Sequence, residues 1–169
     1  MDIIDEITED HRHIRTKLEA LVSPEVATRE KKTAFFELSS LLGSHTEAEE
    51  KTIYAFAKKM GALKHFALQS FEEHDTIEAL MEKIKTAKGS AIRQARAKFL
   101  SDILRRHLDE EEQDFLPALR QELSALDSDR LARKYRRVMD APESSAESYG
   151  RVIAMPSRRK SPPLESFAP

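Results

Sequence analysis

HTEAEE, at residues 45–50, is the stretch of sequence that decides the fold. It places Glu49 four residues after His45, a spacing that on an α-helix puts both side chains on one face, about one turn apart. A second stretch, HLDEEEQDFLP at residues 107–117, repeats this spacing. Each stretch therefore predicts a helix that directs an imidazole and a carboxylate toward one point.

Apolar side chains recur at steps of three and four around both stretches, which is the pattern of helices that bury one face. The same pattern predicts two further long helices. One runs through Ile4–Leu21 with His11 on its apolar face, and the other through Leu63–Ile84 with His74 on its apolar face. The helix that carries HTEAEE should continue to about Lys59. We therefore expect four long helices.

Two helix boundaries are left open by the sequence. Ser23-Pro24-Glu25 breaks the chain after the first helix and can also start the second, with Ser23 as its cap and Pro24 at its first position. Pro117 should either kink the fourth helix or end it, with a short restart to Leu123.

The composition also favours an all-α fold. Charged residues make up 34% of the 169 residues, and the chain has 4 glycines and 7 prolines, as expected of long solvated helices. Because there is no cysteine, disulfides, thiolate metal sites and cysteine nucleophiles are excluded. The opening residues lack a basic region followed by an apolar one, and no long apolar run can span a membrane, so we expect a cytoplasmic location.

The C-terminal part of the chain differs from the rest. A basic, amphipathic helix is expected from Ser128 to about Asp140, docked on the outside of the bundle. Residues 142–169 are rich in proline, serine and arginine, which predicts a flexible tail. The sequence thus predicts a bundle over residues 1–125, a short basic helix over 126–141, and the tail.

Four histidines fall on the apolar faces of four different helices. They are 34, 29 and 33 residues apart along the chain, so antiparallel neighbours bring them to one layer. A buried carboxylate is costly unless paired, whereas a divalent cation neutralises carboxylates and binds neutral imidazoles. Such donors suit iron, manganese or zinc, and four imidazoles with two shared carboxylates fit two metal ions. The predicted ligands are His11, His45, Glu49, His74, His107 and Glu111.

Some neighbouring residues have two interpretations. Histidine with glutamate at the fourth following place also occurs by chance, and His74 with Glu78 forms a third such pair. Glu78 can ligate the centre or lie in solvent beside Lys83. His13 and His65 lie off the apolar faces and are expected at the surface.

Two further groups near the predicted centre are also open. Tyr54 lies either near the centre or in ordinary core packing. Acidic residues that adjoin the ligands can orient the imidazoles through hydrogen bonds or can simply be solvated. These acidic residues are Asp10, Glu50, Glu73, Asp75 and Asp109.

The motifs resemble the hemerythrin HHE cation-binding family. The resemblance covers about residues 2–123 and implies an up-down-up-down four-helix bundle around two iron ions, bridged by Glu49 and Glu111 and by an oxo or hydroxo group. It rests on four motifs in the same order: DH at 10–11, HTEAEE at 45–50, EEHD at 72–75 and HLDEEEQDFLP at 107–117.

Two positions differ from the oxygen-carrying members of that family. Those proteins have a second histidine one turn after the third-helix histidine and an aspartate five residues after the fourth-helix histidine, where this chain has Glu78 and Glu112. The resemblance therefore implies a protein that senses or handles oxygen, peroxide or nitric oxide. Weak peroxide breakdown stays open, and no catalytic residue is assigned. The resemblance also pairs the imidazoles at the two irons, His11 with His107 and His45 with His74.

A function of another class is also open. The bundle can be structural, with the basic helix and tail binding an acidic partner. Nucleic acid is not favoured as that partner, because no aromatic residues are interleaved with the basic ones. The sequence leaves the oligomeric state undetermined.

Overall fold

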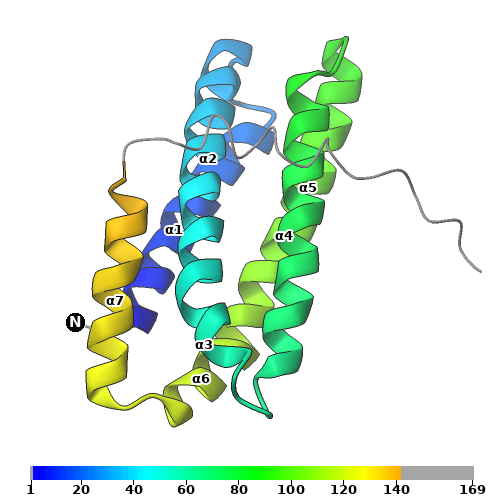
Figure 1. Cartoon of the computed structure of the whole chain (residues 1–169). Helices are drawn as coiled ribbons and strands as arrows, with labels where there is room; N and C mark the ends of the chain where they lie inside the picture. Colours follow the sequence, from blue (N-terminus) through cyan, green and yellow to red (C-terminus); the bar gives the residue numbers. More distant parts are fainter. Residues whose placement is uncertain (1, 142–169) are drawn as a thin grey trace, which may run out of the picture.

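The computed structural model describes residues 2–141, and this part of the chain is helical with no strand in it (Figure 1). Successive long helices run antiparallel, so the predicted up-down-up-down bundle with a short fifth helix is confirmed. The α-helices are α1 (Ile3–Val22), α2 (Thr28–Glu49), α3 (Ala55–Ala57), α4 (Lys64–Lys85), α5 (Ser90–Glu110), α6 (Leu116–Glu122) and α7 (Ala125–Met139).

Two short π-helices interrupt the bundle helices. The first, η1 (Glu50–Tyr54), follows α2 directly, and the second, η2 (Glu111–Phe115), follows α5 directly. The helix with HTEAEE therefore does not continue unchanged to Lys59. The short restart expected toward Leu123 is present as α6, with Pro117 in its first turn, and it follows the wider π turn without a gap in the helix.

The start of the second helix, left open by the sequence, lies after Ser23-Pro24-Glu25. α2 begins at Thr28, and Ser23 instead ends α1, where its backbone N–H donates to the Glu19 carbonyl over 2.9 Å. The residue before α2, Ala27, is extended, with φ −63° and ψ 150°. Ser23-Pro24-Glu25 is thus a connection and not a helix start.

The buried apolar side chains form two core clusters, one on each side of the histidine layer. One cluster contains Ile3 and Ile7 of α1 together with residues of η1, α6 and α7. The other contains Ile14 and Leu18 of α1 together with residues of α2, α4 and α5. On α1, His11 lies between the two sets. The centre of the bundle is therefore enclosed by apolar packing at both ends.

The fifth helix, α7, packs against α1, α2 and η1. It begins a turn earlier than predicted because the Ser124 side chain caps it, accepting from the Asp127 backbone N–H over 3.0 Å. The backbone N–H of Ile3 donates to Ser128 over 3.2 Å, which ties the start of α1 to α7. The predicted tail at 142–169 lies outside the described residues, and the boundary at 125 stays a prediction. Within residues 2–141, no helix is long and apolar enough to cross a membrane.

Candidate metal centre

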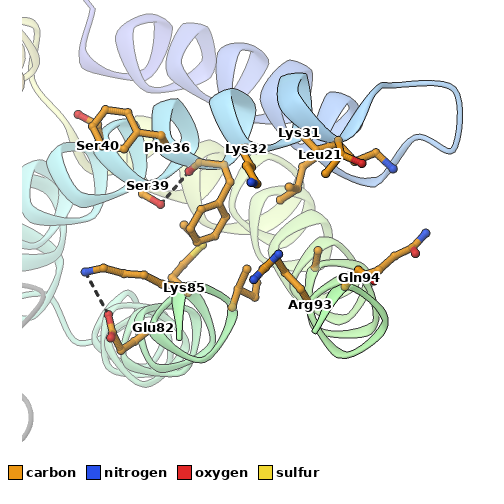
Figure 2. A pocket seen from close by; sticks show the side chains of 16 residues that line it. Leu21, Lys31, Lys32, Phe36, Ser39, Ser40, Glu82, Lys85, Arg93 and Gln94 are labelled. Carbon is orange, nitrogen blue, oxygen red and sulfur yellow. Dashed lines mark hydrogen bonds and ion pairs between the residues drawn. The ribbon is translucent and has the colours of Figure 1, made fainter. Parts of the chain in front are cut away.

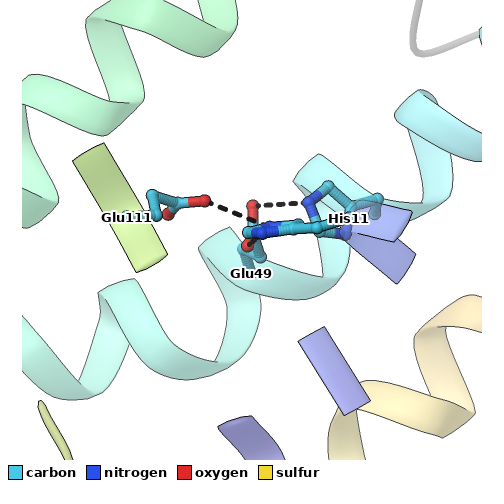
Figure 3. Close-up of side chains that lie close together, drawn as sticks. His11, Glu49 and Glu111 are labelled. Atoms are coloured by element: carbon cyan, nitrogen blue, oxygen red, sulfur yellow. Dashed lines mark ion pairs between the residues drawn. The ribbon is translucent and has the colours of Figure 1, made fainter. Parts of the chain in front are cut away.

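The six predicted ligand side chains meet inside the bundle, and each of them is buried. They come from α1, from the end of α2, from α4 and from the junction of α5 with η2. Their relative exposures are 0 to 4%, so water does not solvate the two carboxylates. Figure 3 shows His11, Glu49 and Glu111 pointing toward one another. The spacing argument from the sequence therefore placed these side chains correctly.

Glu49 is at the middle of the group. Its carboxylate oxygens lie 3.3 Å from Nε2 of His45, 3.4 Å from Nε2 of His74 and 3.8 Å from Nε2 of His11. Glu111 lies opposite, with Oε2 at 3.3 Å from Nε2 of His11 and 3.6 Å from Nε2 of His107. Each carboxylate therefore touches imidazoles from more than one helix.

The outward nitrogen of every one of these imidazoles has a hydrogen-bond partner. Nδ1 of His11 donates to Glu112 over 2.9 Å, Nδ1 of His74 to Glu50 over 3.0 Å, and Nδ1 of His107 to Glu73 over 2.7 Å. Nδ1 of His45 lies 2.7 Å from the hydroxyl of Tyr135, which in turn donates to Asp10 over 2.6 Å. A carboxylate can only accept, and the Tyr135 hydroxyl already donates to Asp10, so in each case the proton is on Nδ1.

This arrangement leaves lone pairs at the inner nitrogens. A neutral imidazole protonated at Nδ1 has an acceptor at Nε2, so without a cation the Nε2 atoms and the carboxylate oxygens that they face are all acceptors. Nε2 of His74 and Nε2 of His107 lie only 3.2 Å apart. Four buried atoms at the centre have no hydrogen-bond partner: His11 Nε2, His45 Nε2, Glu49 Oε1 and Glu111 Oε2. Buried polar atoms are rarely left in this state, and a cation between them removes the deficit.

The donor atoms fall into two groups that share Glu49. One consists of His11, His45, Glu49 and Glu111, and the other of Glu49, His74 and His107. In each group the ligand atoms lie within 4.8 Å of one another. The pairing taken from the family resemblance is not followed, because α1 packs beside α2 and α4 beside α5. His11 and His45 are accordingly neighbours, with ring centroids 5.1 Å apart, as are His74 and His107 at 5.0 Å.

The π-helices explain how two adjacent glutamates serve different partners. Glu49 ends α2 and faces the centre, while Glu50 begins η1 and accepts from His74. In the same way Glu111 faces the centre and Glu112 accepts from His11. A π turn adds a residue to the helical repeat and commonly occurs at functional sites. The Glu-Glu pairs thus supply both an inner carboxylate and an outer one.

Comparison with known proteins agrees with this geometry. The model of the hemerythrin HHE cation-binding domain matches residues 2–119. The chain belongs to this family. It is also 27% identical to an uncharacterized hemerythrin-like protein of Schizosaccharomyces pombe over 172 residues, covering 98% of this chain and 79% of the relative. It is therefore a hemerythrin-like, cation-binding protein.

Tyr54 lies at the hemerythrin-like centre and not merely in the core. Its hydroxyl donates a short hydrogen bond to Oε1 of Glu111 and lies 3.4 Å from both Glu49 and His74. Burial and the charges of Glu111 and Glu49 raise the pKa of Tyr54 well above its ordinary value, so the hydroxyl keeps its proton. Of the two positions that the sequence left open for Tyr54, the structure has the one near the centre.

Two outer partners were not identified from the sequence. Tyr135 is 90 residues from His45 and lies on α7, beyond the part matched by the family model, so no local spacing connects the two residues. Arg15 holds Glu112 over 2.8 Å and Asp109 over 2.5 Å. Glu112, noted as a departure from oxygen carriers, thus lies outside the donor groups and orients His11.

Other candidates do not join the centre. His13 and His65 are exposed, as predicted, and so is Asp75. Glu78 is half-buried and belongs to neither donor group among residues 2–141. Burial, Asp75 and Glu50 raise the pKa of Glu78.

The pKa directions show how strongly the centre attracts positive charge. Burial alone would raise the pKa of Glu49, yet the imidazoles of His45, His11 and His74 hold it well below its ordinary value. Burial alone would lower the pKa of His74, yet Glu49 and Glu50 raise it to about 9. The two buried carboxylates therefore need cations, and protons on the imidazoles compete with a metal ion for the same place.

Proposed function

We propose that this protein holds two iron ions through His11, His45, Glu49, His74, His107 and Glu111, and senses or handles oxygen, peroxide or nitric oxide. The observation that carries the proposal is the fixed orientation of all four imidazoles. Each has its Nδ1 proton committed to an outer acceptor, so each presents an Nε2 lone pair to the carboxylates between them. Ligand atoms about 2.1 Å from an ion lie roughly 3.0 to 3.4 Å from one another, close to the separations found here.

Imidazole and carboxylate donors without thiolate suit iron, and shared carboxylates suit two ions. Bound iron would supply redox chemistry and coordination of a small ligand. In this proposal the centre has four imidazoles, because glutamates occupy positions 78 and 112 and neither of them lies in the donor groups. A centre with fewer imidazoles than that of the oxygen carriers favours ferric iron, so reversible oxygen carriage is not the proposed role.

The surrounding residues support the handling of small molecules. The two apolar core clusters limit access by water on either side of the centre. Tyr54 provides a protonated hydroxyl at Glu111, and Tyr135 accepts a hydrogen bond from His45 Nδ1 and donates its own to Asp10. These groups can donate or hold a proton without leaving a buried charge unpaired.

The decisive experiment is metal analysis of protein prepared in iron-supplemented medium, followed by anaerobic reduction and exposure to oxygen. We expect about two iron ions per chain. The oxidation by oxygen, monitored by visible absorption, should be one-way. Iron content near zero would contradict the proposed centre. An absorption band that appears with oxygen and disappears when oxygen is removed would show a carrier instead.

The alternative of a structural bundle that binds an acidic partner is weakened by the contacts of α7. Arg136 binds Glu6 at 2.6 Å, Arg133 binds Asp129, and Lys134 donates to the carbonyl of Lys51. Most cations of this helix are therefore already used within the described part of the chain. A salt-dependent binding assay with full-length and tail-deleted protein tests what the remaining basic residues do.

A further inference from the structure

A large groove opens between α2 and the pair formed by α4 and α5 (Figure 2). Its volume is about 590 Å³, in the range of roughly 300 to 1,000 Å³ that is usual for small-molecule sites. It lies on the side of the metal centre away from α6 and α7. The groove shares no residue with the candidate metal ligands.

The groove exists because α2 packs mainly on α1, while α4 packs on α5. The second core cluster is consequently open along one side, and its residues form the floor. Apolar side chains from four helices line it: Leu21, Phe35, Met81, Ile84 and Ala97. Phe36, at the edge, is 73% exposed. Such an apolar surface in a folded chain indicates a binding site.

The rim of the groove is basic. Four basic residues line it: Lys31 and Lys32 of α2, Lys85 of α4 and Arg93 of α5. The one acidic lining residue, Glu82, pairs with Lys85 at 3.5 Å. Within residues 2–141, Lys31 and Lys32 have no ion pair. Figure 2 shows Lys32 and Arg93 on opposite sides of the groove. Arg93 gives one N–H to the Ala87 carbonyl and keeps other donors for a ligand.

We propose that this groove binds a free, unbranched aliphatic carboxylic acid. The chain of the acid would lie on the apolar floor and its carboxylate between Lys32 and Arg93, which offer charge-assisted hydrogen bonds. A second copy of the protein is disfavoured as the occupant, because it would bring two basic rims together. Residues 142–169 are disfavoured because they carry four basic residues against three acidic ones and so offer the basic rim no net negative charge.

Calorimetric titration of the full-length protein with octanoate, decanoate and dodecanoate tests this proposal. Affinity should rise about fourfold per added methylene that is buried. Decyltrimethylammonium, with the same apolar chain and opposite charge, should bind at least about tenfold more weakly than decanoate. Equal binding of the two amphiphiles would reduce the groove to a non-specific apolar surface and overturn the proposal.

Variants locate the site. Lys32→Glu and Arg93→Glu should each weaken decanoate binding about tenfold, while Lys98→Glu, an exposed position of α5 outside the groove, should leave it unchanged. Helicity and melting temperature report whether each variant folds. Three other results would overturn the proposal: decanoate binding that Lys98→Glu weakens equally, binding to anionic phospholipid vesicles without binding of free decanoate, or a ligand-independent dimer that Lys32→Glu dissociates.

Discussion

The α2–η1 and α5–η2 segments are built alike but surrounded differently. Each carries a histidine, a glutamate four residues later and a second glutamate at once after it, and each then forms a five-residue π-helix. Where the first segment has Tyr54, the second has the apolar Leu116 at the matching position. In addition, α7 packs on α2 and η1, and there it supplies Tyr135 to His45.

This difference separates the residues that bind a cation from the residues that adjust the properties of the bound cation. The repeated part provides inner carboxylates and outer acceptors on both sides of the centre. The part that is not repeated provides two hydroxyls: that of Tyr54, from η1, donates to Glu111 on the opposite segment, and that of Tyr135, from α7, accepts from His45. We infer that the repeated residues determine binding and that the tyrosines adjust the affinity and the electronic properties of the bound ion.

The largest effect is expected from removing the charge of an inner carboxylate. Glu49→Gln should reduce bound iron from about two ions to fewer than one per chain, because Glu49 contacts three imidazoles and belongs to both donor groups. Glu111→Gln should retain more iron, since Glu111 belongs to one group. Metal analysis and melting temperature measure both, with Glu47→Gln as control. Equal iron loss in the two variants would mean that Glu49 is not the shared ligand.

The next effect concerns the metal-free protein and pH. Glu49 and Glu50, adjacent residues of the α2–η1 segment, raise the pKa of His74 from 6.5 to about 9. A raised histidine pKa contributes stability that is complete below pH 6.5 and is lost as pH rises through 9. Metal-free protein should therefore lose up to about 3 kcal/mol of unfolding free energy between these values.

Iron-loaded protein should show the opposite trend, because iron binding requires deprotonated imidazoles and so strengthens as pH rises from 5. Urea unfolding of both forms across the pH range measures the two slopes. In Glu50→Gln the metal-free slope should become shallower. Parallel slopes for the metal-free and iron-loaded forms would contradict competition between protons and metal.

The bundle and the six buried side chains could be predicted from sequence because they depend on periodic spacing. His45 and Glu49 lie four residues apart on one helix, and the four histidines lie at compatible distances along antiparallel helices. Polar residues at core positions of four helices are a strong signal that their side chains meet inside the bundle. Helical period and the distances between the helices were enough for this part of the site.

The π-helices and the outer hydrogen bonds could not be predicted in this way. Whether a π turn forms here depends on the partners that Glu49 and Glu50 reach from the widened backbone. Those partners lie on other helices, so they are a matter of tertiary structure. Tyr135 is 90 residues from His45 and reaches it only because α7 folds back over α2. The sequence left the start of α2 at Thr28 open, because proline at a first helical position is only a preference.

The tyrosines should have intermediate effects that differ in kind. Tyr135→Phe removes the acceptor for His45 Nδ1 and should weaken iron binding about tenfold, the lower end for loss of a residue that orients a metal-ligating histidine. Tyr54→Phe leaves every imidazole oriented and should change iron affinity less. It should instead shift the visible absorption of the ferric protein, because Glu111 loses its short hydrogen bond. Competition with a chelator and absorption spectra measure the two variants.

Leu116→Tyr is the complementary test, since it places a phenol at the position that matches Tyr54. If the hydroxyl alone matters, it should partly restore the spectrum in a Tyr54→Phe background. If Tyr135→Phe changes neither chelator competition nor spectrum, α7 packs on the bundle without orienting His45.

The smallest effect should separate the two outer glutamates that follow the inner ones. Glu50→Gln and Glu112→Gln each keep an oxygen that accepts from Nδ1, so the imidazole stays oriented and only the charge is lost. Arg15 already offsets the charge of Glu112, whereas no cation pairs with Glu50 in the described part of the chain apart from His74. Glu50→Gln should therefore weaken iron binding about fivefold, and Glu112→Gln about twofold. Chelator competition at constant ionic strength can resolve this difference, and a larger effect at Glu112 would show that Arg15 does not balance its charge.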